Sequence, residues 1–343
     1  MSRKAKRQPE KLPLMRRLAI TATSGFATVL LALMLFGVWA VWSYNGPGPE
    51  PRAPGVTNVM LRKGAGLNEI ASSLERAGVI RSGSIFIAAA QVTGAARELK
   101  AGEYEFQPRV SMAKVLEDVR EGRIVRHQVT IPEGMTSEMV VEILAREPAL
   151  TGVAPTPPEG TVLPETYDFQ RGEDRAAVLQ RMMDAHDKLA AQLWAKRQPG
   201  LPYVTLEEAI ILASIVEKET GVASERPQVA SVFVNRLRKG MRLESDPTII
   251  YGISKGRPLG RKIFLSELTS PSNTYNTYVI DGLPPTPIAN PGRAALAAVM
   301  DPPKSDYLFF VADGTGGHAF AATYEEHLRN VENWRAWRAR TGK

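Results

Sequence analysis

Residues 205–221 read TLEEAIILASIVEKETG and predict a helix. Thr205 and Glu208 have capping-box spacing, in which each side chain bonds the other residue's backbone amide at the start of a helix. Gly221 is the residue type that most often follows a helix end. Between these signals the apolar residues recur with helical period.

One glutamate continues the apolar face of this predicted helix. Leu212, Ile215 and Val216 lie seven, four and three residues before Glu219, so all four share one face. Apolar surroundings disfavour an ionised carboxyl and should raise its pKa. A glutamic acid protonated near neutral pH is what a general acid for glycosidic cleavage requires. Glu217 lies about 200° around the helix and cannot share that face.

The sequence around this helix resembles a known family. The resemblance rests on SIVEKETG (214–221), VASERPQVASVFVNRLRKGM (222–241), RLESDPTIIYG (242–252), PSNTYNTYVIDGLPPTPIANPG (271–292) and YLFFVADGTGGHAF (307–320). These stretches resemble the endolytic murein transglycosylases of the YceG-like family, over about residues 57 to 335. The resemblance implies a mixed α/β catalytic domain and a lyase that cuts peptidoglycan strands internally. It also implies 1,6-anhydro-N-acetylmuramic acid ends and a role as a terminator of nascent glycan elongation.

The resemblance also implies site residues. The family's catalytic glutamate maps to Glu219, and Glu217 is the second choice. The other motif residues are expected to bind substrate through ring faces, amides and hydroxyls: Asn235, Arg236, Asp246, Thr248, Tyr275, Asn276, Thr277, Tyr278, Pro285 and Asn290. Asp246, Pro247 and Thr248 are predicted to form a turn with Asx or N-cap character.

One residue departs from the family pattern. Glu244 stands where relatives commonly carry a neutral residue. It would raise the pKa of a neighbouring glutamate if it lay near the site; otherwise it points to solvent. Further along, Asp313–His318 (DGTGGH) predicts a hairpin turn between strands 307–311 and 319–321, and Thr323–Arg338 predicts a capped amphipathic helix.

The amino terminus predicts a membrane anchor. Residues 1–17 carry a net charge of +6, and the 25 residues from Leu18 to Trp42 carry none. A helix of that length spans about 37 Å, enough for a hydrocarbon core about 30 Å thick. The basic side should stay cytoplasmic, so residues 57–343 would be periplasmic on the inner membrane, after a linker at 43–56. A cleaved signal peptide is the alternative, but the apolar run exceeds its usual length.

Two stretches before the catalytic region resemble each other. Leu61–Ile80 and Ile131–Leu150 both combine a strand-like start, a glycine turn and an amphipathic helix, 70 residues apart. AGEYEFQ at 101–107 and PETYDFQ at 164–170 form a second pair. The pattern predicts an α+β organisation: strand–helix–helix–strand units, a duplicated LysM-like region at 57–150 and a catalytic domain at 151–343. LysM folds bind N-acetylglucosamine-containing glycans.

Composition and charge narrow the function classes. The chain has 343 residues, a net charge of +7 and no cysteine, which excludes disulfides, a cysteine nucleophile and a thiolate metal site. Subtracting the tail's +6 leaves +1 for residues 18–343, which argues against nucleic acid as a partner. No cofactor or metal is expected, because the four histidines show no ligand spacing: His127, His186, His318 and His327.

Three function classes stay open from sequence alone. The first is the lyase, with peptidoglycan as substrate and cell-wall synthases as the family's natural partners. The second is a membrane-anchored, non-catalytic glycan-binding scaffold built on the repeated units. The third is a lysozyme-type hydrolase, which would need a second essential carboxylate. The products distinguish the three classes. The lyase would leave anhydro ends, the scaffold no new ends, and the hydrolase reducing ends.

Overall fold

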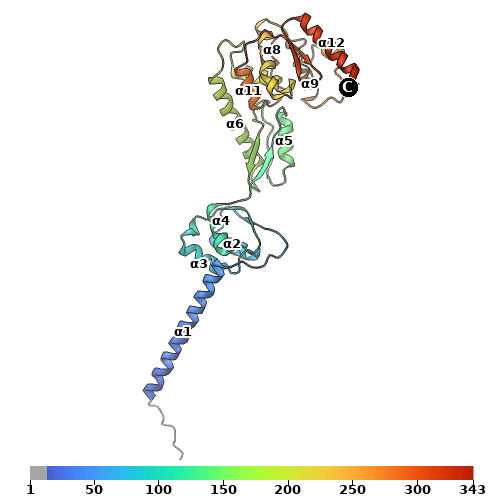
Figure 1. Cartoon of the computed structure of the whole chain (residues 1–343). Coiled ribbons are helices and arrows are strands. Elements are labelled where there is room, and N and C mark those ends of the chain that lie inside the picture. The colour runs from blue at the N-terminus through green and yellow to red at the C-terminus, as the bar shows by residue number, and fades with distance from the viewer. Residues whose placement is uncertain (1–13, 343) are drawn as a thin grey trace, which may run out of the picture. The chain divides into compact units, whose positions relative to one another are not determined.

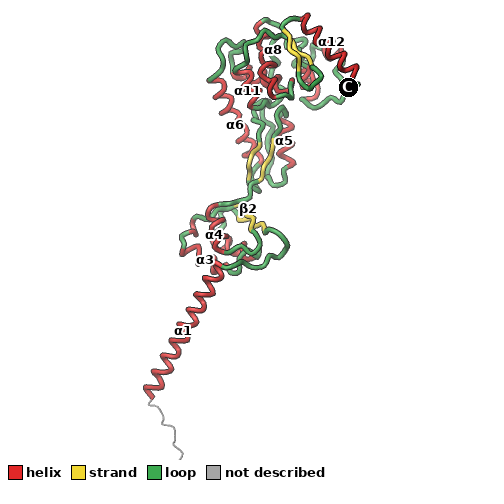
Figure 2. Tube along the Cα trace, viewed as in Figure 1, coloured by secondary structure: helices red, strands yellow, loops and turns green. Residues whose placement is uncertain are grey.

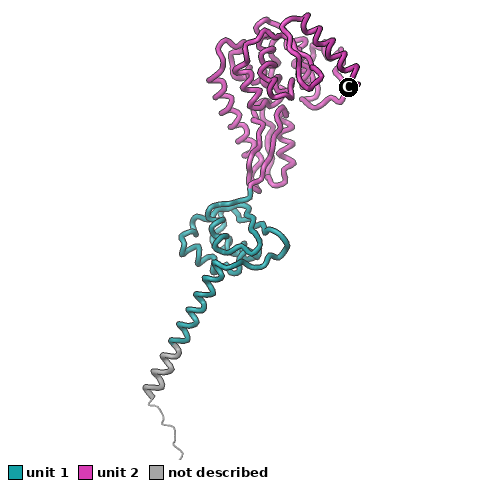
Figure 3. The backbone as a smooth tube through the Cα atoms, viewed as in Figure 1, with its two compact units in different colours: residues 1–125 teal, residues 126–343 magenta. Residues whose placement is uncertain are grey.

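The computed structural model describes residues 14–342. Backbone contacts divide the chain into two compact units, Met1–Val125 and Arg126–Lys343 (Figure 3). The three sheets of the described chain are antiparallel strand pairs, β1–β2, β3–β4 and β5–β6. The predicted mixed α+β class is confirmed. The predicted basic tail lies outside the described residues except for its last four positions.

The first helix of unit 1 has the length and composition of a membrane span. Helix α1 covers Leu14–Asn45, and its stretch Phe26–Asn45 has a mean hydropathy of 2.1 with 6% of its residues buried. An apolar helix that packs so little surface against protein is suited to a lipid environment. An amino-terminal signal sequence has the same properties.

The rest of unit 1 has the predicted strand–helix–helix–strand order. Strand β1 (Thr57–Leu61) is followed by α2 (Leu67–Arg76), α3 (Gly83–Val92), the short η1 (Ala95–Arg97) and β2 (Gly102–Phe106). β1 and β2 pair antiparallel, with Val59 opposite Tyr104. Helix α4 (Met112–Glu121) completes a core that includes Phe86, Tyr104 and Phe106.

Unit 2 begins with a related strand–helix–strand arrangement. Strand β3 (His127–Thr130), α5 (Ser137–Arg146), β4 (Thr166–Phe169) and α6 (Arg175–Ala195) follow in order, and Val129 lies opposite Tyr167. Tyr104 and Tyr167 each donate a hydrogen bond of 2.8 Å to the carbonyl four residues earlier. Equal register and equal hydrogen bonds are what a duplicated unit would produce.

The second copy differs from the first in one segment. Residues 147–165, which correspond to the place of α3, form a loop without a helix (Figure 2). Asn290 holds this loop in unit 2, because its Oδ1 accepts a hydrogen bond from the Val162 amide at 3.0 Å. Contacts therefore divide the chain after Val125, whereas the predicted domain limit at residue 150 lies inside unit 2.

The core of unit 2 is built on three helices. Helices α7 (Leu206–Glu219), α8 (Arg226–Arg238) and α11 (Arg293–Met300) pack against one another, and α11 also contacts α6 (Figure 1). The predicted capping box of Thr205 and Glu208 is present and confirmed. A short η2 (Ala223–Glu225) joins α7 to α8.

The carboxy-terminal elements cover one side of this core. Strands β5 (Phe309–Ala312) and β6 (His318–Ala321) form the predicted hairpin, and α12 (Tyr324–Thr341) follows with its predicted capping box. Between α8 and α11 lie α9 (Asp246–Ser254) and the short α10 (Leu265–Leu268). Asp246, Pro247 and Thr248, predicted as a turn with Asx or N-cap character, form the first turn of α9, where proline is tolerated; Ser245, and not Asp246, holds the N-cap position.

Candidate active site

Glu219 is the last residue of α7. Its helix is buried from Ile211 to Glu217, and the chain leaves the helix at Thr220 in an extended conformation (φ −136°, ψ 130°). The carboxyl is therefore held at the end of a rigid, packed element. The predicted apolar face is present, since Leu212, Ile215 and Val216 are all fully buried.

A serine that sequence reasoning missed contacts this carboxyl. The Ser245 hydroxyl donates a hydrogen bond of 2.5 Å to Glu219 Oε1. Ser245 is the residue before α9, yet its side chain caps no backbone amide of that helix. The S-D-P-T pattern signals a helix start, but nothing local shows that the serine would contact a residue 26 positions earlier.

The surroundings of Glu219 favour its protonated form. Burial raises its pKa to about 7, and the negative charge of Asp246 acts in the same direction. The Ser245 hydrogen bond and the Arg236 charge oppose this shift without cancelling it. A carboxyl with such a pKa both donates and accepts a proton near neutral pH, as acid–base catalysis needs.

Glu217 has different partners on the other side of α7. Its Oε1 accepts a hydrogen bond of 2.7 Å from Arg226, and its Oε2 accepts one of 2.9 Å from the Gly292 amide. Arg226 also pairs with Glu133 at 2.9 Å. Only 3% of the Glu217 side chain is exposed. Its pKa is raised by burial, which outweighs the opposing hydrogen bond from Gly292 and the charge of Arg226.

Three of the predicted substrate residues are electrostatically coupled to Glu219. Asp246 and Arg236 both influence its pKa, and the Tyr278 hydroxyl donates 2.7 Å to Asp246 Oδ1. Burial raises the pKa of Tyr278, and the Asp246 and Glu219 charges add to that shift. Glu244 is half-exposed and pairs with Arg236 at 3.0 Å. Glu244 is not among the charges that shift the Glu219 pKa, whereas it adds to the raised pKa of Tyr278.

The other predicted substrate residues hold the backbone of the site or lie apart from Glu219. The Thr248 and Thr277 hydroxyls lie 2.9 Å apart, and Thr277 Oγ1 accepts the Ser245 amide at 2.9 Å. Asn276 donates to the carbonyls of Glu267, Leu268 and Ser270. Four predicted substrate residues remain. Asn235 and Asn290 donate hydrogen bonds to backbone carbonyls. The Tyr275 hydroxyl bonds that of Thr286, and Pro285 is exposed.

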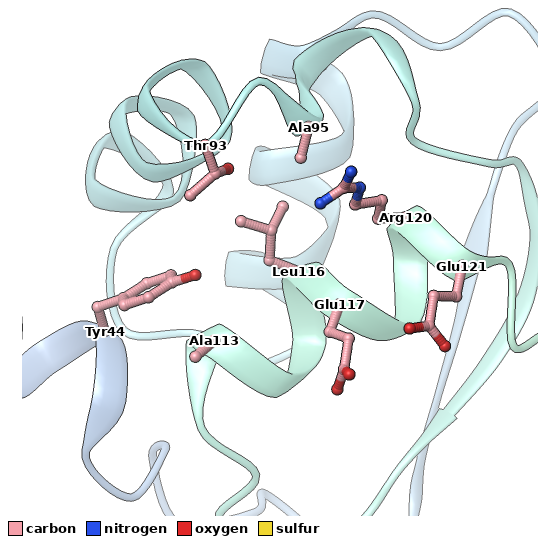
Figure 4. Close-up of a pocket in the computed structure, with 8 residues that line it drawn as sticks. All are labelled: Tyr44, Thr93, Ala95, Ala113, Leu116, Glu117, Arg120 and Glu121. Atoms are coloured by element: carbon pink, nitrogen blue, oxygen red, sulfur yellow. The ribbon is translucent and has the colours of Figure 1, made fainter.

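Unit 1 contains a pocket of about 430 Å³ between the end of α1, α3, η1 and α4 (Figure 4). It is lined by Tyr44, Thr93, Ala95, Ala113, Leu116, Glu117, Arg120 and Glu121. Its charged side chains form surface ion pairs, Arg120 with Glu98, Glu117 with Lys114, and Glu121 with Arg123. Among residues 14–342, no three His, Asp or Glu side chains converge as metal ligands would.

Comparison with known proteins gives a consistent family. The profile of the YceG-like family matches residues 59–333. A protein named endolytic murein transglycosylase from Streptococcus pneumoniae is 29% identical over 321 residues, which cover 80% of this chain and 57% of that protein. One of the same name from Bacillus subtilis is 28% identical over 311 residues, which cover 81% of this chain and 84% of that protein.

A solved structure shares the fold. The crystal structure of a YceG-like protein from Listeria monocytogenes is 30% identical, with a TM-score of 0.50, and covers 80% of this chain and 98% of that chain. The match to the streptococcal relatives, by contrast, spans just over half of their length.

Proposed function

Because the chain belongs to the YceG-like family, we propose that it is an endolytic murein transglycosylase. It cleaves the bond between N-acetylmuramic acid and N-acetylglucosamine within peptidoglycan strands and leaves 1,6-anhydro-N-acetylmuramic acid ends, so it is a lyase acting on a polysaccharide. The relatives named endolytic murein transglycosylase support the substrate class. The observation that carries the chemistry is the position of Glu219 at the end of the packed helix α7, where Ser245 donates a hydrogen bond to Oε1 and burial raises the pKa of the carboxyl.

One carboxyl is enough for this reaction. Protonated Glu219 donates its proton to the glycosidic oxygen, and the bond from that oxygen to the muramoyl C1 breaks. The substrate's own 2-acetamido group stabilises the positive charge that develops at C1. Ionised Glu219 then takes the proton of the C6 hydroxyl, whose oxygen bonds C1 and closes the anhydro ring. The enzyme ends in its starting state, and no water is consumed.

The contacts of Glu219 fit these two roles. The Ser245 hydroxyl occupies Oε1, which leaves Oε2 for the proton that moves to and from the substrate. The Asp246 charge helps to keep that proton bound near neutral pH. We assign Arg236, Asp246 and Tyr278 to the substrate side of the site. Buried Thr248, Asn276 and Thr277 hold its walls. Asn235, Tyr275 and Asn290 contact other parts of unit 2, Pro285 is exposed, and none of these four is assigned to the substrate.

The placement in the cell is part of the proposal. We propose that α1 is a single inner-membrane anchor with a cytoplasmic amino terminus and a periplasmic catalytic region, and that the strand–helix–helix–strand unit within residues 57–150 binds glycan as LysM-like modules do. The 20-residue apolar stretch of α1 supports the anchor. The enzyme would end nascent strands close to the membrane, where the synthases that elongate them are natural partners.

The test is product analysis in H₂¹⁸O with the full chain in detergent. The chain is incubated with peptidoglycan strands, and the new ends are examined by mass spectrometry. A lyase gives anhydro ends that contain no ¹⁸O. Their mass is lower than that of reducing ends by one molecule of water. Reducing ends that carry ¹⁸O would show a hydrolase, and bound strands without new ends would show the glycan-binding scaffold; either result would contradict the proposal.

A further inference from the structure

A carboxylate outside the proposed catalytic contacts joins two distant parts of unit 2. Glu225, at the end of η2, accepts hydrogen bonds from both the backbone amide and the ring of His318, each at 2.8 Å. Since the acceptor is a carboxylate, Nδ1 of the ring carries the proton in this contact. Two bonds from one residue fix both the position and the orientation of the carboxylate.

The same carboxylate reaches the residue next to Glu219. The Thr220 hydroxyl donates to Glu225 Oε2 at 3.2 Å and accepts the Val222 amide at 3.0 Å. The Thr220 side chain is buried. These bonds define the path of the chain as it leaves α7, directly after the proposed catalytic carboxyl.

The hairpin is shaped to receive Glu225. A Cβ atom at Gly317 would lie 2.5 Å from Glu225 Oε1, so the carboxylate can approach this closely only because residue 317 is glycine. The His318 ring packs edge-on against Phe310 of β5, which packs edge-on against Phe233 of α8. The DGTGGH turn, predicted as a hairpin turn, is therefore held against the core helices.

We infer that Thr220, Glu225 and His318 are positioning residues that anchor the carboxy-terminal end of α7 to the β5–β6 hairpin and so limit the access of water to the partly buried Glu219. This inference rests on the proposed function for its catalytic consequence. None of the three is assigned contact with substrate; they act through Glu219. A looser α7 end would admit water to the carboxyl and stabilise its ionised form.

The charged groups around Glu219 are independent of this anchor. Asp246 of α9, Arg236 of α8 and the phenol of Tyr278 are the titratable groups that interact with the carboxyl from neighbouring elements. None of them bonds Thr220, Glu225 or His318 in the contacts described above. A change in the Glu219 pKa after loss of the anchor would therefore report the altered burial of the carboxyl.

The experiment compares matched substitutions in the full chain. Thr220→Val keeps the shape of threonine and removes its hydroxyl, whereas Thr220→Ser keeps the hydroxyl. Glu225→Gln removes the negative charge that accepts the hydrogen bonds of Thr220 and His318, and so weakens the same anchor without changing Thr220. The Glu219 pKa is measured by infrared absorption of its protonated carboxyl, a band that is assigned by its loss in Glu219→Gln. The kcat and KM for the formation of anhydro ends are measured from pH 5 to 9.

We expect Thr220→Val and Glu225→Gln to lower the Glu219 pKa by about one unit, and Thr220→Ser to leave it unchanged. At pH 7 the protonated fraction would fall from about one half to about one tenth, so kcat should fall about five-fold with KM unchanged.

An unshifted Glu219 pKa in both Thr220→Val and Glu225→Gln would overturn the inference, even if the melting temperature fell. A shift in Thr220→Val alone would overturn the part played by Glu225 and His318. If Thr220→Val does not fold, Glu225→Gln decides. The infrared titration needs no turnover, so a wild-type chain that forms no anhydro ends would refute the proposed function while the titration still tests the anchor.

Discussion

Replacing Glu217 by glutamine should weaken the fold while leaving the chemistry in place. Glu217 is buried between Arg226 and the Gly292 amide, and removing one partner of a buried ion pair costs about 3–5 kcal/mol. Two contacts that remain in the variant reduce this loss of folding free energy. Arg226 keeps Glu133 at 2.9 Å, and the glutamine oxygen can still accept the Gly292 amide. We therefore expect the free energy of unfolding to fall by about 3 kcal/mol.

The assay is urea unfolding of the full chain in detergent, followed by tryptophan fluorescence. Three of the five tryptophans lie in unit 2, Trp194, Trp334 and Trp337, so the signal reports largely on that unit. Glu207→Gln is the matched control, because Glu207 lies on the same helix and is exposed; its effect should stay within about 0.5 kcal/mol. Equal unfolding of the two variants would refute the structural role of Glu217. Loss of product by folded Glu217→Gln would assign that residue to the chemistry.

Two further predictions follow from other buried groups. The folded chain holds the Glu219 proton more tightly than the unfolded chain, whose carboxyl has the ordinary pKa of 4.5. The free energy of unfolding should therefore fall by about 3 kcal/mol as the pH rises from about 4 to about 8, and Glu219→Gln should lack this decline in urea titrations at each pH. Asn290→Ala leaves the Val162 amide and the Met135 carbonyl without its side chain as partner. It should cost about 3 kcal/mol in the same assay, and a loss below 0.5 kcal/mol would contradict the proposed anchoring of the 147–165 loop.

Features with local causes were predictable from the sequence. The Thr205 capping box and the hairpin after β5 depend on residues within a few positions of each other, and both are present. The strand–helix pattern of residues 57–106 was also predictable, because alternation and helical period are local signals. Glu219 and Glu217 were separated correctly onto two faces by the helical repeat alone.

Features that depend on distant contacts were not predictable. Ser245 and Glu219 lie 26 residues apart, and Glu225 and His318 lie 93 residues apart. Residue type was a poor guide in the loop at 271–292. Asn276 has the chemistry of a sugar ligand, but it is buried and its amide bonds three backbone carbonyls. The family resemblance named Arg236, Asp246 and Tyr278, but their interactions with Glu219 depend on how the fold places α8, α9 and the Tyr278 segment.

The most direct test of the central claim is a comparison of anhydro-end formation by Glu219→Gln and Glu217→Gln. Both variants are measured as the full chain at pH 7, with product normalised to the folded fraction. We expect Glu219→Gln to lose activity by at least about 10²-fold, because a positioned proton donor contributes about 10²–10⁴-fold, and folded Glu217→Gln to keep its activity. Undiminished anhydro ends with Glu219→Gln would show that Glu219 is not the proton donor.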